Sequence, residues 1–365
     1  MCNRQKSTRT PREECSVTSA GYWIKSLGLG ILAAGSVIAL TATPAKAQGP
    51  LTVLCGVQEE WCKAIAVAFE KKTGTAVAMS RKSAGEALAQ IRAESANPKT
   101  DVWWGGPGDP HLQAAEEGLT MAYESPQFAD LQPWAQSQYK QSQGRSVGIY
   151  AGALGFVYNT ELLAKRKISA PKCWADLLRP EFKEEIQIAN PNASGTAYTA
   201  LATLVQVLGE DGAFDYLKKL NDNVNQYTKS GSAPAAAVAR SETLVGIIFM
   251  HDGINQKVNG FPVDVAAPCE GTGYEIGSVS IIKGTKNLDT AKAFYEFALS
   301  PEGQATGAET KQFQMPSNRK AAIPPEAPKL EAIRMIDYNF QKFGTAEERK
   351  RLLSRWDAEI KAVAK

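Results

Sequence analysis

The chain has 365 residues, of which 44% are hydrophobic and 22% are charged, a balance that excludes a disordered or low-complexity protein. Its formal net charge is +3, but residues 1–47 hold six of the 41 Lys and Arg residues and two of the 38 Asp and Glu residues. The remaining 318 residues therefore carry a net charge of −1, which removes bulk-charge support for binding nucleic acids or anionic membranes. A chain of this length favours two domains over one.

Residues 1–47 have the features of a cleavable signal peptide. Lys25 precedes the apolar run LGLGILAAGSVIAL, and the AKA sequence at 45–47 fits the small-x-small pattern of a signal-peptidase site. The run is too short and too poorly flanked for a membrane anchor, and no twin-arginine pair precedes it. We therefore predict ordinary secretion and a mature chain that begins near Gln48. The long stretch before Lys25 leaves open either a downstream start or an extended leader.

The first part of the mature chain alternates between strand and helix patterns. The strand patterns lie at 51–55, 75–80 and 100–106, and the helix patterns lie at 59–74, 83–98 and 109–118. Ser83 and Glu86 have the spacing of a capping box, and Asp109 is expected to cap the third helix. Such alternation predicts a mostly parallel, doubly wound sheet.

A second α/β series follows the apolar, glycine-containing segment 146–160. Its strand patterns lie at 185–191, 243–250, 261–268 and 274–284, its helix patterns lie at 194–209, 212–222 and 288–300, and a charged stretch closes the chain at 344–365. Two such series predict two lobes, with crossover strands near 148–157 and 276–282.

Four cysteines remain after the leader, namely Cys55, Cys62, Cys173 and Cys269. An even number of cysteines in an exported protein indicates disulfides, and three pairings are possible. We favour Cys55–Cys62 and Cys173–Cys269, because the first two are close enough to join a strand end to the next helix. No C-x₂-C pair is present, which disfavours structural zinc.

Three short segments share a Ser- and Gly-rich character just before a predicted helix: KSAGE (82–86), NASGT (192–196) and KSGSA (229–233). Helix starts offer free backbone N–H groups and a partial positive charge, and both suit a phosphate or a carboxylate. The candidate anion-binding residues are Ser83, Ala84, Gly85, Ser194, Gly195, Thr196, Ser230 and Gly231. For any one segment, simple helix capping is the better interpretation, but three segments together favour convergence on one anion. Arg81 and Lys229 could add charge, although such residues are usually solvated.

The WWGG sequence (103–106) ends a predicted strand. Alternation sends its two Trp side chains to opposite faces, so one can be core while the other lines a cleft and packs on a sugar ring. We take Trp104 and Gly106 as candidate ligand contacts, because ligands in open α/β sheets favour the carboxyl ends of strands. Burial of both Trp residues is an equally supported alternative.

His251 and Asp252 follow directly on the apolar run 247–250, and His251 is one of only two histidines in the chain. The pair could be a metal site, a catalytic pair, a hydrogen-bonding pair for a polar ligand, or a structural turn. Nucleophile-elbow, zinc-protease and P-loop motifs are absent from the sequence, and adjacent strand residues point apart, which disfavours catalysis. The second histidine, His111, is expected at the surface or in a cap.

Four segments carry a resemblance to a known family: CGVQEEWCKAIAVAFEKKTG, DVWWGGPGDPHLQAAEEGLT, ANPNASGTAYT and GTGYEIGSVSIIKG. They resemble periplasmic solute-binding proteins of ABC importers, in the ferric-iron-binding-protein-like (type II) group and in particular its hexose-phosphate-binding member. The resemblance implies a two-lobed α/β fold with a ligand cleft between the lobes, hinge closure and delivery to an inner-membrane permease. It also implies a monomer with lobe 1 at 48–150, lobe 2 at 151–277, and a return to lobe 1 with C-terminal helices across both lobes at 278–365.

The resemblance also suggests roles for individual residues. The iron-binding relatives are expected to use adjacent tyrosines, but this chain has no Tyr-Tyr pair and carries His251 and Asp252 at the corresponding place, which argues against a metal. In the hexose-phosphate-binding member, a His-Asp pair and a later Glu are expected to bind sugar hydroxyls, and Glu275 is the matching position. A hinge carboxylate is the alternative for Glu275, and Tyr274 and Glu270 are weaker candidates.

We therefore expect a periplasmic binding protein for a phosphorylated sugar or polyol, with no catalytic activity, no cofactor and no nucleic-acid partner. The helix starts would hold the phosphate, and His251, Asp252 and Glu275 would hold hydroxyls. Ferric iron and 2-aminoethylphosphonate are alternative ligands, and in the second case Asp252 or Glu275 would meet the amine. An exported phosphate-ester enzyme is the alternative from another class.

Overall fold

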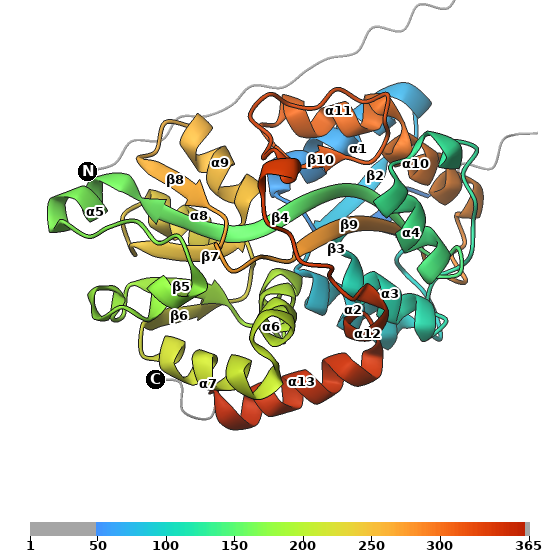
Figure 1. Ribbon diagram of the computed structural model, residues 1–365. Helices are drawn as coiled ribbons and strands as arrows, with labels where there is room; N and C mark the ends of the chain where they lie inside the picture. The colour runs from blue at the N-terminus through green and yellow to red at the C-terminus, as the bar shows by residue number, and fades with distance from the viewer. Residues whose placement is uncertain (1–48, 362–365) are drawn as a thin grey trace, which may run out of the picture. The chain divides into compact units, whose positions relative to one another are not determined.

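A 13-residue strand, β4 (Val147–Asn159), runs across the molecule in the computed structural model, which describes residues 49–361 (Figure 1). The predicted signal peptide lies outside the described residues. The first half of β4 pairs with β9 (Tyr274–Ile281), and its second half pairs with β7 (Val245–Phe249) and β8 (Val263–Ala266). β4 therefore belongs to two sheets, which define lobe 1 and lobe 2, and the predicted two-lobed α/β fold with its crossover is confirmed.

Lobe 1 is built on the strand order β2-β1-β3-β9. Its parallel strands are β1 (Leu51–Cys55), β2 (Val77–Arg81) and β3 (Val102–Pro107), and the two-residue strand β10 (Met315–Pro316) pairs with β4. Its helices are α1 (Glu59–Thr73), α2 (Ala84–Glu94), α3 (Gly108–Glu116), α4 (Pro133–Gln141), α10 (Leu288–Leu299) and α11 (Pro301–Glu309). Apolar clusters form on both faces of the sheet, as expected for parallel strands covered by helices.

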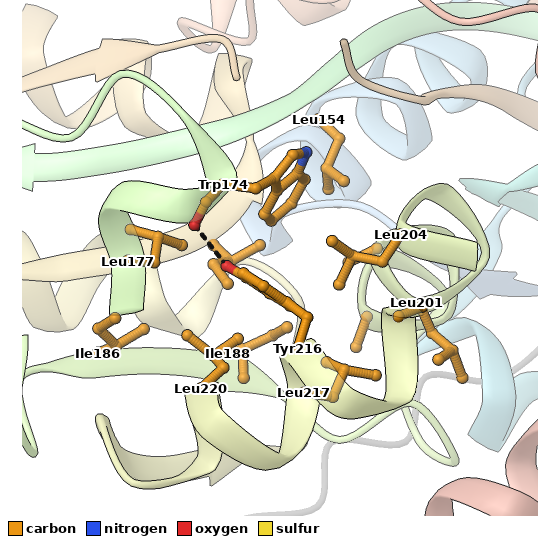
Figure 2. Close-up of a cluster of buried hydrophobic side chains, with 14 of the residues drawn as sticks. Leu154, Trp174, Leu177, Ile186, Ile188, Leu201, Leu204, Tyr216, Leu217 and Leu220 are labelled. Carbon is orange, nitrogen blue, oxygen red and sulfur yellow. Dashed lines mark hydrogen bonds between the residues drawn. The ribbon is translucent and has the colours of Figure 1, made fainter. Parts of the chain in front are cut away.

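Lobe 2 is built on β7, β5 (Ile186–Ala189) and β6 (Val224–Thr228), which are parallel. Its helices are α5 (Thr160–Arg166), α6 (Gly195–Leu208), α7 (Glu210–Asn221), α8 (Ala233–Ala239) and α9 (Met250–Val258). Figure 2 shows its core, in which Trp174 packs among leucines. The Tyr216 hydroxyl donates to the Trp174 carbonyl at 2.7 Å, which satisfies two polar groups inside an apolar cluster.

The C-terminal segment contributes α12 (Phe340–Phe343) and α13 (Ala346–Glu359). Trp356 of α13 belongs to the apolar core of lobe 2, and α13 lies beside α7 (Figure 1). At the other end of α13, the Ala346 N–H donates to a Glu116 carboxylate oxygen on α3 of lobe 1 at 2.9 Å. The segment therefore contacts both lobes.

Several elements have no counterpart in the predicted patterns, and α9 matters most among them. It begins at Met250, the last residue of the predicted strand 243–250, and no helix was predicted there. Gly253 is a weak helix former, which masked the helix in the sequence. In the structure, a Cβ at Gly253 would lie 2.4 Å from Val265 Cγ1, so a glycine is needed for α9 to approach the sheet.

Both favoured disulfides are present. Cys55–Cys62 joins the end of β1 to α1, and Cys173–Cys269 joins two loops of lobe 2 across a sequence separation of 96 residues. Between residues 49 and 361, no helix is long and apolar enough to cross a membrane.

Removal of the long-range disulfide by Cys173→Ala with Cys269→Ala is expected to lower the free energy of unfolding by roughly 2–4 kcal/mol. The bridge closes a long loop, so its loss enlarges the unfolded ensemble, whereas neither side chain is fully buried and little packing is lost. Urea denaturation measures the change. An unchanged midpoint and slope would show that the bridge contributes no net stability.

Candidate functional site

A cavity lies between the lobes, where the carboxyl ends of the parallel strands of both sheets meet. Lobe 1 lines it with residues at or just after the carboxyl ends of β1, β2 and β3, and lobe 2 lines it with residues at or after the carboxyl ends of β5, β6 and β7. About 430 Å³ of empty space lies between its walls, part of it open to solvent. The edge expected from the rule for open α/β sheets therefore carries the cavity.

The fold brings together most of the residues predicted to bind a ligand. The cavity wall includes Ser83, Ala84, Gly106, Ser194, Gly195, Thr196, Ser230, Gly231, His251, Asp252 and Glu275. Gly85 and Trp104 are absent from the wall. The Gly85 N–H instead donates to the Ala193 carbonyl at 3.1 Å, which makes Gly85 a contact between the lobes.

The two Trp residues of β3 point to opposite faces of the sheet as predicted, but both are buried. Trp104 is 1% exposed and packs edge-to-face on Trp61, with 5.1 Å between the ring centroids. Trp103 stacks on His111 at 3.7 Å on the other face. Helices cover both faces of the sheet, so neither Trp reaches the cavity, and Trp104 lies in the core of lobe 1 instead of lining a cleft.

The expected surface position of His111 is wrong, because the side chain is fully buried. Its Nδ1 lies 2.8 Å from Ser280 Oγ and its Nε2 lies 3.2 Å from the Gly105 carbonyl. Burial lowers the pKa of His111 to about 3, so the ring is neutral. Asp109 likewise lies inside the first turn of α3 rather than at its cap, and Tyr338 donates to its carboxylate.

One end of the cavity is rich in hydrogen-bond donors. The N-termini of α2 and α6 line it, and Ser194 caps α6 by accepting from the Ala197 N–H at 3.4 Å. The Ser83 N–H donates to Glu86 Oε2 at 3.3 Å, as the predicted capping box requires. Arg81 is the single cationic side chain among the lining residues, and its Nη2 donates to Ser230 Oγ at 3.0 Å. Capping and cavity lining are therefore combined in the same segments.

The other end is rich in acceptors. His251 and Asp252 lie in the first turn of α9, and Glu275 lies on β9. His251 Nε2 is 3.8 Å from Asp252 Oδ1 and 3.6 Å from Glu275 Oε1. His251 and Asp252 are neighbours in a helix and not in a strand, and both line the cavity. The argument that adjacent strand residues point apart therefore does not apply to them.

Burial controls the protonation of this end. It raises the pKa of Asp252 to about 7 and, together with the charge of Asp252, holds the pKa of Glu275 well above its ordinary value. Burial also lowers the pKa of His251 to about 3. The imidazole is therefore neutral at pH 7, and the two carboxyl groups resist carrying two negative charges together.

The position of the His251 ring depends on a glycine in β4. A Cβ at Gly152 would lie 2.5 Å from His251 Nδ1, so any side chain there would displace the imidazole. Gly152 lies opposite Glu275 in the β4–β9 ladder, which places the glycine next to the carboxyl group as well. A crossover strand was predicted near 148–157, but the role of its glycine in placing the His251 ring was not.

Outside the three Ser- and Gly-rich segments, three further polar residues line the cavity and were not predicted from the sequence: Gln58, Tyr150 and Gln314. The Gln58 side-chain amide donates to Asp252 from the opposite lobe, and the Gly106 N–H donates to the Tyr150 hydroxyl oxygen at 3.0 Å. Each is one polar residue in a separate segment, so no local pattern could have identified them.

In the part of the chain that the structure describes, one group of three side chains has the residue types and the spacing that could bind a metal ion. Cys173, Cys269 and Glu270 lie close enough to share an ion, but the two sulfurs are joined in a disulfide and cannot act as thiolates. The Glu270 carboxylate instead accepts from the backbone N–H groups of Trp174 and Ala175 at 2.8 and 3.0 Å. Glu270 therefore has a structural role outside the cavity.

The two α/β lobes and the polar cavity between them define the class of type II periplasmic binding proteins. Residues 108–342 match the family described as bacterial extracellular solute-binding protein, and the chain belongs to that family.

Each of three similar proteins aligns with most of this chain and over most of its own length. An uncharacterized protein of Haemophilus influenzae is 43% identical over 338 residues, which is 92% of this chain and 97% of the relative. The structure of the periplasmic binding protein AfuA from Actinobacillus pleuropneumoniae, with exogenous fructose-6-phosphate bound, superposes with a TM-score of 0.82 at 46% identity and covers 86% of this chain and 99% of AfuA. A Salmonella typhimurium periplasmic protein, named as a candidate for binding 2-aminoethylphosphonate, is 27% identical over 298 residues, 77% of this chain and 83% of that protein.

Asp252→Asn is expected to stabilise the ligand-free protein at pH 7 by roughly 1–4 kcal/mol. The folded pKa of Asp252, about 7, lies above its unfolded value, so the stability contributed by this group is full below about pH 4 and is lost as the pH rises toward 7. Asparagine cannot ionise and keeps the oxygen that accepts from Gln58. The gain should therefore vanish near pH 4.

Thermal or urea unfolding at pH 4 and pH 7 measures this difference. Asp215→Asn is the matched control, because Asp215 is largely exposed and its substitution should change stability by less than about 0.5 kcal/mol. A gain of the same size at both pH values would contradict the assignment.

Proposed function

We propose that the protein captures a phosphorylated sugar or polyol in the periplasm and delivers it to the permease of an ABC importer. The observation that carries this proposal is the polarity of the cavity, which has a donor-rich end and an acceptor-rich end. A ligand with an anion at one end and hydroxyl groups at the other satisfies both. The signal-peptide features at residues 1–47 support export.

The donor-rich end suits a phosphate. The starts of α2 and α6 supply backbone N–H groups and the positive ends of two helix dipoles, and Ser194 adds a hydroxyl donor. Arg81 can add one charge-assisted hydrogen bond. An anion held largely by neutral donors needs few cations, which agrees with a single arginine among the lining residues.

The acceptor-rich end suits hydroxyl groups. Asp252 and Glu275 offer carboxyl oxygens, and neutral His251 can donate from one ring nitrogen while it accepts at the other. The side-chain carbonyls of Gln58 and Gln314 are buried without a partner among the described residues. Unsatisfied acceptors cost free energy, so ligand hydroxyls that reach them contribute affinity and specificity. The fructose-6-phosphate bound to AfuA, a 46% identical protein, supports this ligand class.

A 2-aminoethylphosphonate ligand is a second candidate, supported by the two carboxyl groups. Asp252 and Glu275 would meet the ammonium group and would then ionise more readily, because a nearby cation lowers a carboxyl pKa. Ferric iron is disfavoured, since burial and the charge of Glu275 hold the pKa of Tyr150 far above its ordinary value and oppose the phenolate that a hard cation needs. We propose that no bond of the ligand is broken.

Contacts between the lobes beside the cavity support capture by closure. Ser83 Oγ donates to the Lys229 carbonyl at 3.0 Å, and Arg81 reaches Ser230 from the opposite lobe. Both pairs join the segments that line the donor-rich end. A ligand anion bridging these segments would stabilise the closed arrangement, which is the form that we propose the permease recognises.

A thermal-shift experiment on the mature protein tests the proposal against its rivals. Hexose phosphates at 100 times Kd should stabilise the protein by about 2.7 kcal/mol, whereas free sugars should have little effect. Stabilisation by ferric citrate alone would refute the proposal. Stabilisation by 2-aminoethylphosphonate without any hexose phosphate would favour the second candidate, and release of inorganic phosphate from an ester would indicate an enzyme.

Substitutions at opposite ends of the cavity should separate the two binding functions. His251→Ala is expected to weaken hexose-phosphate binding by about 1–3 kcal/mol and to spare inorganic phosphate, because it removes a partner of the hydroxyl groups only. Thr196→Val removes a hydroxyl donor in the first turn of α6 and should weaken the binding of both hexose phosphate and inorganic phosphate. Titration calorimetry measures both affinities. An equal loss of affinity for both ligands in His251→Ala would instead indicate that His251 contacts the phosphate or is needed for folding.

A further inference from the structure

Gln314 occupies an unusual place at the end of the cavity. It directly precedes β10, which pairs with Tyr150 and Ala151 of β4, so its backbone is held against the shared strand. The residue is 5% exposed. Gln314 lines the ligand cavity and also a smaller chamber behind it.

The smaller chamber lies within lobe 1 and is nearly filled by the side chains around it. It is lined by Trp61, Gln304 and Gly307 among others, and Tyr150 and Gln314 are the residues that it shares with the ligand cavity. These two side chains therefore form the wall between the chambers. Trp61 is held in place behind the wall, because its indole N–H donates to Thr306 Oγ1 at 2.9 Å.

The two side chains of the wall differ in how their polar atoms are satisfied. The Tyr150 hydroxyl oxygen already accepts from the Gly106 N–H, whereas Gln314 Oε1 is buried without a protein partner. Buried carbonyl oxygens are rarely left unpaired, so this atom calls for a donor from a molecule that enters the cavity. A sugar hydroxyl is such a donor, and a phosphate oxygen is not.

We propose that Gln314 is a specificity-determining residue for the ligand. Its side-chain carbonyl accepts a hydrogen bond from one ligand hydroxyl, and its bulk separates the ligand from the chamber behind it and so limits the size of the ligand. This role rests on the proposed function, since it requires a ligand with hydroxyl groups.

The hydrogen bond is tested with Gln314→Met, which keeps the length of the side chain but removes the acceptor. Binding of glucose 6-phosphate should weaken roughly 5- to 100-fold, while binding of inorganic phosphate should not change. Among the monodeoxy analogues of glucose 6-phosphate, the one that lacks the contacting hydroxyl should bind the wild type and Gln314→Met equally well. Titration calorimetry gives the affinities, and the melting temperature without ligand confirms folding.

Gln312→Met is the matched control. Gln312 lies two residues away, lines the chamber behind the wall but not the ligand cavity, and its amide donates to the Thr310 carbonyl. Its substitution should change the affinity for glucose 6-phosphate by less than about twofold, because Gln312 does not line the ligand cavity.

The size limit is tested with Gln314→Ala, which opens the wall. The affinity for N-acetylglucosamine 6-phosphate relative to glucose 6-phosphate should rise by about fivefold or more, since the larger substituent can occupy the space that the Gln314 side chain leaves. An unchanged ratio would overturn this part of the role. Equal losses for glucose 6-phosphate and all its deoxy analogues in Gln314→Met, or no loss at all, would overturn the hydrogen bond. A wild type that binds none of these esters would refute the proposed function itself.

Discussion

The fold depends on one constraint, namely that a single strand is shared by two sheets. β4 gives its first half to lobe 1 and its second half to lobe 2, and its backbone groups are hydrogen-bonded in both. Because the parallel strands of each lobe end toward the junction, the loops and helix starts that follow them face one another there. The cavity is thus a consequence of strand direction and needs no dedicated pocket-forming element.

The shared strand also explains how three titratable groups can be buried together. A glycine at position 152 leaves room for the imidazole of His251, and Glu275 lies opposite that glycine on the neighbouring strand. Burial then opposes charge on all three groups, which costs stability in the ligand-free protein. Such a cost at a binding site is expected when polar groups are prepared for a ligand rather than for the fold itself.

The sequence determined the features that arise from neighbours along the chain. The strand and helix alternation at 51–118, the Ser83 capping segment, the Ser194 cap and the pairing Cys55–Cys62 all follow from a few adjacent residues, and the structure has each of them. Backbone propensity, capping and short-range chain connection act over one or two helical turns. Such features can therefore be recognised without any knowledge of the fold.

Tertiary structure alone decided the features that depend on distant segments. Trp104 is buried in the core because helices cover both faces of its sheet. The alternation of side chains along a strand cannot by itself reveal this. The helix that carries His251 contains the weak helix former Gly253, which its packing against the sheet requires, so packing overrode local propensity. Gln58 and Gln314 reach the cavity from segments more than 250 residues apart in the chain. Cavity contacts depend on strand register and helix placement across the whole molecule, and no local pattern encodes them.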